Sequence, residues 1–224
     1  MFQTIIKWFL SLFKKTETVV EAPIPAEPPK PKQVTEQELR DALVARALKD
    51  VGKREDKGPN RSLWIDIMNS WMSKIIGVDL TGAAYCITGQ QYNLNEVCKE
   101  LKLINPVFKT PSTQDFFRNG AVKKYIRPHG IFAKKGDWVS FQHISDAGKG
   151  HEGMVTENQI NPMTFQTVEY NTNNAGSRAG DGCWTLKRST AGSANLKFQG
   201  FIDVVQWVLD VNYPKQNTQD KGVV

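Results

Sequence analysis

The stretch Gly136-Asp137-Trp138-Val139-Ser140-Phe141 marks the point at which the hydrophobic pattern of this 224-residue chain changes. Apolar and polar residues alternate along it, which is typical of a half-buried β-strand. Before this stretch apolar residues recur at helical spacing, and after it several short alternating stretches follow one another. Because helices come first and strands second, the sequence predicts an α+β fold in which N-terminal helices pack on an antiparallel sheet.

The first helix before this point has a clear start at Thr35. Thr35 and Glu38 have the spacing of a capping box, and Val34 and Leu39 have that of a hydrophobic staple. A second helix is expected from Ser62 to Ile76, burying one face that is formed by Leu63, Ile67, Trp71 and Ile75. The remaining helices are expected over 86–103 and 112–124, and the strands over 137–141, 153–156, 165–169, 184–188 and 198–208.

The first 32 residues differ in composition from the rest of the chain. Residues 1–15 are densely apolar, end in two lysines and are shorter than the roughly 20 apolar residues of a membrane-spanning helix. We interpret them as an amphipathic segment that contacts either a membrane surface or a protein partner. Five prolines make residues 16–32 a semi-rigid linker. The folded domain is expected over residues 33–212, followed by a C-terminal tail over 213–224.

Charge and cysteine content narrow the classes of partner and of site. The chain has 29 Lys and Arg against 23 Asp and Glu, a net charge of +6 that favours an anionic partner. This charge is spread out rather than gathered in a basic stripe, so we expect no nucleic-acid partner. Three cysteines cannot all pair, and none lies in a C-x-x-C motif. We therefore expect no disulfide framework, no metal site and no cofactor.

Cys86 is the candidate nucleophile among the three cysteines. It follows the small residues Gly82-Ala83-Ala84 and Tyr85 at the expected start of a helix, where unpaired backbone N–H groups lower a thiol pKa. Cys98 lies in the apolar stripe of the same helix and Cys183 lies at a strand start, so both are interpreted as buried hydrophobic residues.

His151 is the candidate general base, because it lies between Gly150 and Gly153 at the entry of a hydrophobic strand. His143 is its competitor, although its position resembles a strand end. Glu169 and Asn171 share one face of a later strand by the two-residue period. Either side chain can accept the imidazole N–H and fix its tautomer, as the third member of a Cys–His–acid or Cys–His–amide triad does.

Taken together, and in their order along the chain, the motifs resemble those of the CHAP family of cysteine- and histidine-dependent amidohydrolases/peptidases, which cleave peptidoglycan. The resemblance spans roughly residues 35–210 and is carried by the stretches 52–60, 82–86, 135–139, 150–155, 168–173, 176–188 and 200–202. The chain departs from the family at Ile87 to Gln91, where small apolar residues are usual, and at Tyr170, where glycine is common. It has no evident oxyanion side chain upstream of Cys86 and no acidic calcium-binding loop.

The resemblance implies a papain-like fold with the nucleophile at a helix N-terminus. It implies roles for Cys86 as nucleophile, His151 as general base, Glu169 as the residue that orients His151, and Asn171 as a supporting polar residue. The implied function is that of a peptidoglycan hydrolase acting at the bacterial cell wall, as a phage endolysin does. It would be an N-acetylmuramoyl-L-alanine amidase or an endopeptidase of the peptide stem or cross-bridge. The alternatives are a catalytically inactive CHAP-like binding module and a virion or envelope structural protein.

Overall fold

The computed structural model describes residues 33–127, 130–175 and 180–214. The segments expected over 1–15 and 16–32, and most of the tail expected over 213–224, lie outside these described residues. No helix that the described residues form is long and apolar enough to cross a membrane. Helical elements come first in the chain. They are α2 (Glu36–Leu48), α3 (Leu63–Ile76), α4 (Cys86–Glu100), α5 (Thr113–Asp115), the π-helical turn η1 (Phe116–Gly120) and the 3₁₀ turn η2 (Lys123–Tyr125).

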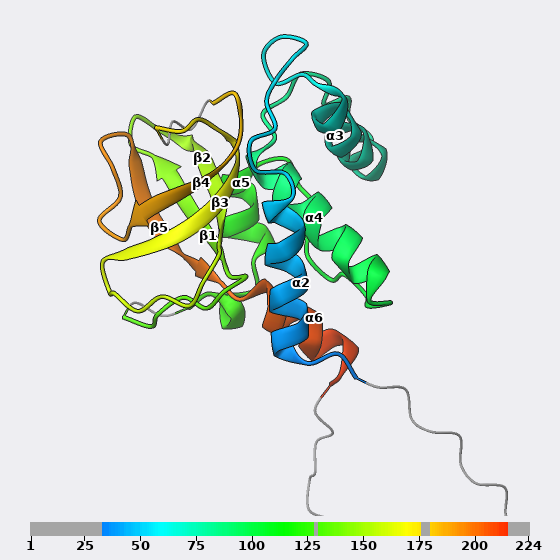
Figure 1. Ribbon diagram of the computed structural model, residues 1–224, viewed down its shortest axis with the longest axis vertical. Helices are drawn as coiled ribbons and strands as arrows, with labels where there is room; N and C mark the ends of the chain where they lie inside the picture. The colour runs from blue at the N-terminus through cyan, green and yellow to red at the C-terminus, as the bar shows by residue number, and fades with distance from the viewer. Residues whose placement is uncertain (1–32, 128–129, 176–179, 215–224) are drawn as a thin grey trace, which may run out of the picture. The chain divides into compact units, whose positions relative to one another are not determined.

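Five strands then form one antiparallel sheet in the order β4-β3-β2-β1-β5, and a last helix, α6 (Val204–Asn212), follows them. The strands are β1 (Trp138–His143), β2 (Asp146–Val155), β3 (Thr164–Thr172), β4 (Gly182–Ser189) and β5 (Leu196–Ile202). Helices α2, α4 and α6 lie together on one side of the sheet (Figure 1). The prediction of an α+β fold with an antiparallel sheet is confirmed.

The main hydrophobic core lies between these helices and the sheet. The buried side chains Trp138, Met154 and Val168 belong to this core and come from neighbouring positions of β1, β2 and β3. Residues at the alternate positions, such as Val139 and Phe141, form a second, smaller cluster. Since successive side chains of a strand point to opposite faces, the sheet is buried on both sides where it carries the candidate site.

The first helix starts as its sequence predicts. The Thr35 hydroxyl accepts a hydrogen bond from the Glu38 N–H at 3.2 Å, and the Thr35 N–H donates to the Glu38 carboxylate at 2.8 Å, so both halves of the capping box form. Leu39 and Leu43, four residues apart, are fully buried. The cap therefore sets where α2 begins and which of its faces packs on the core.

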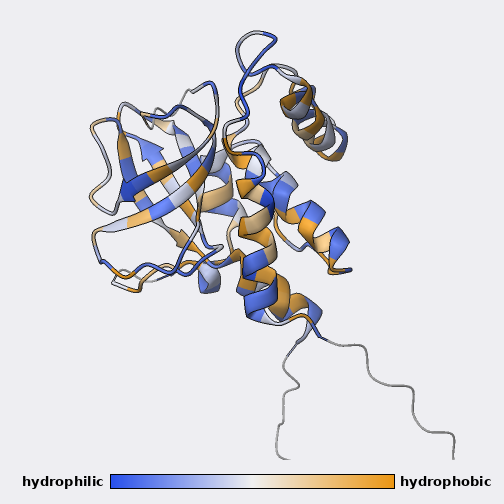
Figure 2. Ribbon diagram, in the orientation of Figure 1, coloured by the Kyte–Doolittle hydropathy of each residue, from blue (hydrophilic) through white to orange (hydrophobic). Residues whose placement is uncertain are grey.

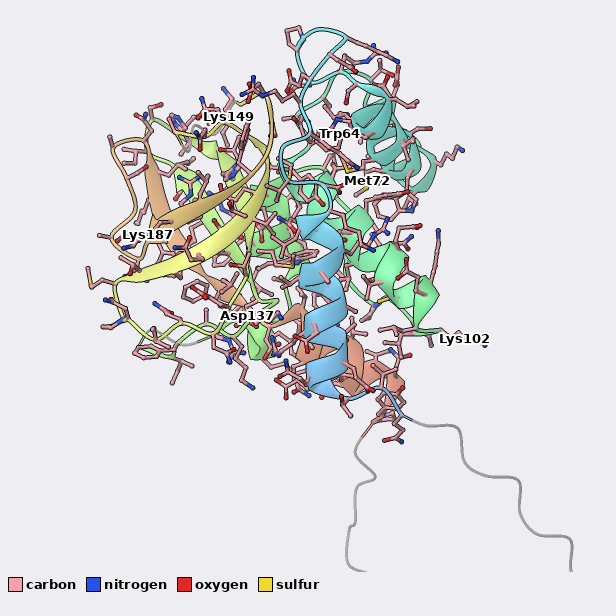
Figure 3. The ribbon with its side chains drawn as sticks, viewed as in Figure 1. Trp64, Met72, Lys102, Asp137, Lys149 and Lys187 are labelled. Atoms are coloured by element: carbon pink, nitrogen blue, oxygen red, sulfur yellow. The ribbon has the colours of Figure 1, made fainter. Side chains whose placement is uncertain are left out.

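A buried network of charges fixes α2 to the sheet. Arg40 donates to Asp137, next to the start of β1, at 2.9 Å, and to Asp203, the N-cap of α6, at 2.7 Å. Arg127 pairs with the same two carboxylates. Figure 3 shows Asp137 where the sheet meets α2. Two guanidinium groups thus balance two carboxylates that burial would otherwise destabilise.

Replacement of Arg40 by Met is expected to lower the free energy of unfolding by about 3 kcal/mol, because fully buried Asp137 loses one of its two cationic partners. Arg46→Met on the same helix is the control. Arg46 is partly exposed and pairs with Glu100 at 3.5 Å, so its loss should cost no more than about 1 kcal/mol. Urea unfolding measures both values, and equal losses for the two variants would contradict a structural role for the network.

The expected buried face of α3 is wrong. Leu63, Ile67 and Ile75 are largely exposed, whereas Ile65, Met68 and Met72 are buried. Figure 2 shows hydrophobic residues along most of α3, and a helix that is apolar on several faces has no unique core stripe. The choice of face is made by tertiary contacts, such as the edge-on packing of the Trp64 ring on the Tyr85 ring at 5.5 Å.

The helix expected over 112–124 is also wrong in its extent. After α5 the backbone widens into η1, in which the Ala121 N–H bonds to the Phe116 carbonyl oxygen at 2.6 Å, and η2 is a separate turn. Gly120 ends η1 where the Phe108 ring occupies the space that a side chain would need. Close packing at Gly120 therefore accompanies the end of this helical segment.

The strand expected over 198–208 is correct only in its first part. β5 ends at Ile202, and Asp203 then caps α6 by accepting a hydrogen bond from the Gln206 N–H at 3.0 Å. Val204, Val205 and Val208 favour a strand by propensity, but with Trp207 they form the buried face of a helix. Side-chain burial against the core thus overrides the β-propensity of this segment.

Candidate active site

Cys86 is the first residue of α4 and is almost fully buried, with 7% of its surface exposed. The preceding residue, Tyr85, occupies the N-cap position but makes no side-chain capping hydrogen bond. The first backbone N–H groups of α4 are therefore not satisfied by a capping side chain, and the Ile87 N–H lowers the pKa of the Cys86 thiol. Such a position favours negative charge on the sulfur.

The start of α4 is held against β3 by close packing. A Cβ atom at Gly89 would lie 2.4 Å from the Tyr170 ring, so only glycine lets the ring contact the first turn of the helix. Gln90 donates to the Val168 carbonyl oxygen at 2.9 Å. The Tyr170 ring thus fills the space above Gly89.

His151, Glu169 and Arg188 come from three neighbouring strands, β2, β3 and β4, and meet in the interior. His151 and Glu169 are fully buried, and His151 Nε2 lies 2.7 Å from Glu169 Oε2. Arg188 Nε donates to Glu169 Oε1 at 2.7 Å, and Thr167 Oγ1 donates to the same oxygen at 2.6 Å. The carboxylate therefore accepts several hydrogen bonds and leaves Nε2 of His151 as a donor.

The second ring nitrogen of His151 is the one left for Cys86. Nδ1 is buried and makes no hydrogen bond of regular geometry with the residues that the structure describes. The imidazole is nevertheless close enough to Cys86 to lower the thiol pKa. Thr113 Oγ1, from α5, lies 3.6 Å from the Cys86 sulfur. A loose thiol–imidazole contact of this kind is common in enzymes without substrate and tightens when substrate binds.

The pKa values of the three side chains are shifted in the directions that an ion pair requires. Burial raises the pKa of Cys86, but His151, Thr113 and the Ile87 N–H outweigh it and lower the value to about 7. Burial lowers the pKa of His151, whereas Cys86 and Glu169 raise it to about 9. For Glu169 the effect of burial is overcome by Arg188 and His151, which lower the pKa to about 2. Between the pKa of Cys86, about 7, and that of His151, about 9, the pair is a thiolate beside an imidazolium.

The alkylation rate of Cys86 by iodoacetamide is expected to rise about tenfold per pH unit up to about pH 7 and then to level off, because the thiolate is the reactive form. Cys98 and Cys183 are internal controls, since burial raises the pKa of Cys98 to about 11 and that of Cys183 further. Peptide mapping after timed alkylation measures all three rates. A Cys86 midpoint near the usual thiol value would contradict the ion pair.

The structure places the other candidate residues differently. Asn171 lies at a β-bulge with a left-handed backbone (φ 53°), and its Oδ1 is buried without a hydrogen-bond partner among the described residues. It is Glu169 that hydrogen-bonds His151. His143 ends β1, where its Nδ1 lies 3.0 Å from Ser145 Oγ. Of the two histidines, His151 is the one that lies next to Cys86.

Two residues of the cluster, Thr113 and Arg188, were not predicted from the sequence as parts of the site. Thr113 lies in a segment expected to be a plain helix, and its contact with Cys86 joins parts of the chain 27 residues apart. Arg188 is 19 residues from Glu169 and was expected only as part of a strand. β4 is only partly buried and Lys187, next to Arg188, is exposed, so nothing in this segment marks Arg188 as the partner of a buried acid.

Within the described residues, no three His, Cys, Asp or Glu side chains come together as a metal site would require. All three cysteines are free thiols. The chemistry that the cluster itself can carry out is nucleophilic attack by a thiolate, with proton transfer by an imidazole that a buried carboxylate orients.

Comparison with protein-family models gives no match, and comparison with curated protein sequences gives none either. Among solved structures, the chain is similar to the crystal structure of a wild-type endolysin, LysIME-EF1, with a TM-score of 0.39 and 16% sequence identity. The similarity covers 73% of this chain and 62% of that one, so the chain spans less than two thirds of the endolysin's length. What the cluster can do chemically therefore follows from its own side chains.

Proposed function

We propose that the chain is a peptidoglycan hydrolase of the CHAP type, with a papain-like arrangement, that cleaves an amide bond through Cys86. The observation behind the proposal is the buried cluster in which His151 acts on the Cys86 thiol and hydrogen-bonds Glu169, which in turn pairs with Arg188. A merely structural cysteine and histidine need no such order of groups, whereas a nucleophile, its base and the group that orients the base require it.

In the proposed reaction the Cys86 thiolate attacks the carbonyl carbon of the scissile amide. The oxyanion that forms is stabilised by backbone N–H groups at the start of α4, at about 3–4 kcal/mol per donor. His151 gives its Nδ1 proton to the leaving amine and, now neutral, takes a proton from water. That water hydrolyses the thioester and frees Cys86. Glu169 accepts from Nε2 throughout, so the imidazole keeps its orientation and the proton passes only at Nδ1.

The substrate is proposed from the family resemblance and the charge of the chain. The amide is either the bond between the sugar and the first alanine of the stem or a bond within the stem or cross-bridge. The net charge of +6 suits an anionic cell envelope and supports action at the bacterial cell wall. A membrane or protein contact through residues 1–15 stays part of the proposal.

Purified cell walls test the function directly. The unmodified protein is expected to lower wall turbidity and to release new amino groups, and Cys86→Ala is expected to abolish both. Cys98→Ala is a matched control, because Cys98 is a buried thiol of the same helix and should leave activity intact. Full activity of Cys86→Ala would refute the proposal. Wall binding without hydrolysis by the unmodified protein would instead identify an inactive binding module.

A further inference from the structure

A cavity of about 640 Å³ lies beside β5, an edge strand of the sheet, and has the size of a ligand pocket. The chain segment around Ile126 runs along this edge, since Ile126 pairs with Ile202 and the Arg127 N–H bonds to the Phe201 carbonyl oxygen at 2.9 Å. The described residues that line the cavity do not include Cys86, His151 or Glu169. It is therefore a site separate from the catalytic cluster.

A short series of residue contacts nevertheless connects this cavity to the nucleophile. Gln199, which lines the cavity, pairs with Gln114 through two reciprocal hydrogen bonds of 2.8 and 3.1 Å. Gln114 follows Thr113, whose hydroxyl lies 3.6 Å from the Cys86 sulfur. Gln114 also donates to the carbonyl oxygen of Phe141, the β1 residue opposite His151. A molecule in the cavity would thus lie next to the elements that hold both reacting groups.

The chemistry of the walls indicates what this molecule is. Most lining side chains are apolar, and they include Phe117, Ile126, Phe132, Phe198 and Phe201. Two cations, Lys123 and Arg127, also line it, and the described lining residues include no Asp or Glu. Arg127 is already balanced by Asp137 and Asp203. Lys123 therefore gives the cavity a positive charge that is open to an anionic ligand group.

The rim of the cavity is unusually apolar for an exposed surface. Ile131 and Phe132 line it and are 51% and 43% exposed, and Met163, next in sequence to the lining residue Pro162, is 52% exposed. Clusters of exposed apolar residues of this kind mark binding surfaces rather than ordinary protein surface.

We propose that this cavity binds the peptide part of the substrate, with a carboxylate of the peptide on Lys123 and small apolar side chains against the phenylalanine rings. The proposal rests on the proposed function, because it makes the cavity a subsite of the same enzyme. A peptide stem that begins with alanine supplies methyl groups of the right size, and its acidic residues supply the carboxylate. A glycan strand without carboxylates would leave the charge of Lys123 unused.

Binding to the full-length Cys86→Ala variant tests the subsite without hydrolysis. The probes are an N-acetylated Ala-γ-Glu-Lys-Ala tetrapeptide with free carboxyl groups, the same peptide with all carboxyl groups amidated, and an N-acetylglucosamine oligomer. We expect the free-acid peptide to bind about fivefold more tightly than the amidated one, and Lys123→Met to remove this difference. Lys124→Met is the control, because Lys124 pairs with Asp210 and does not line the cavity.

Equal affinity for the two peptides, binding of the sugar oligomer alone, no measurable binding of the free acid, or an unchanged Lys123→Met variant would each overturn the subsite. Phe132→Ala is a second variant. Because Phe132 is exposed, a loss of binding in this variant is not explained by misfolding. Wall hydrolysis by the unmodified protein is scored separately. Hydrolysis without Lys123-dependent binding refutes the subsite alone, and Lys123-dependent binding without hydrolysis refutes the proposed function.

Discussion

Replacement of His151 by Ala is expected to lower the rate of wall hydrolysis by about 10⁴-fold. Two effects combine in this loss. The reaction loses the group that protonates the leaving amine, and the buried Cys86 thiol loses the cation that lowers its pKa. Burial then dominates and raises the pKa of Cys86, so little thiolate is present at neutral pH.

The rate of hydrolysis and the alkylation rate of Cys86 measure the two effects separately. His143→Ala is the matched control, since His143 lies at the end of β1 and pairs with Ser145. It should change both rates by less than about twofold, as a surface substitution far from the reacting groups does. If His151→Ala keeps substantial activity while His143→Ala loses it, the assignment of the general base is wrong.

Replacement of Glu169 by Gln is expected to lower hydrolysis by about 10²- to 10³-fold with little change of shape. The amide removes the negative charge that raises the pKa of His151, so the imidazolium loses its proton at a lower pH. The loss of the positive charge on His151 in turn raises the pKa of Cys86. The acidic limb of the pH–rate profile should therefore move to higher pH, which a purely structural defect would not cause.

Asn171→Gly is the control that separates the two candidates for orienting His151. Asn171 has a left-handed backbone, which glycine adopts without strain, so the substitution removes the amide and keeps the bulge. Because Glu169 is the residue that hydrogen-bonds His151, Asn171→Gly should leave the pH–rate profile in place. A shifted profile in Asn171→Gly together with a normal one in Glu169→Gln would assign the role to the amide.

Features that depend on neighbouring residues in the chain were predictable from the sequence. The capping box of Thr35 and Glu38 forms as expected, and Cys86 begins a helix after a run of small residues. The alternation after Gly136 correctly indicated the strand β1. In each case the signal and the structure lie within one element, where local propensity and periodicity operate directly.

Features that depend on distant contacts were not predictable. The buried face of α3 is selected by packing on Tyr85, and the segment after Asp203 becomes helical because its valines are buried against the core. Arg188 joins the candidate site through its hydrogen bond to Glu169 on the neighbouring strand, and Thr113 joins it through the contact of α5 with Cys86. A single sequence does not encode such register in any local pattern. Cys86 and His151 could be nominated from their own surroundings in the sequence and from the family resemblance, but their partners Arg188 and Thr113 could not.

The most direct test of the central claim is mass spectrometry of the fragments released from purified peptidoglycan by the unmodified protein and by Cys86→Ala. We expect fragments that end at one type of amide bond, each with one new amine and one new carboxyl group, and none with Cys86→Ala. Release of the same fragments by Cys86→Ala, or products cleaved only at glycosidic bonds, would contradict the claim.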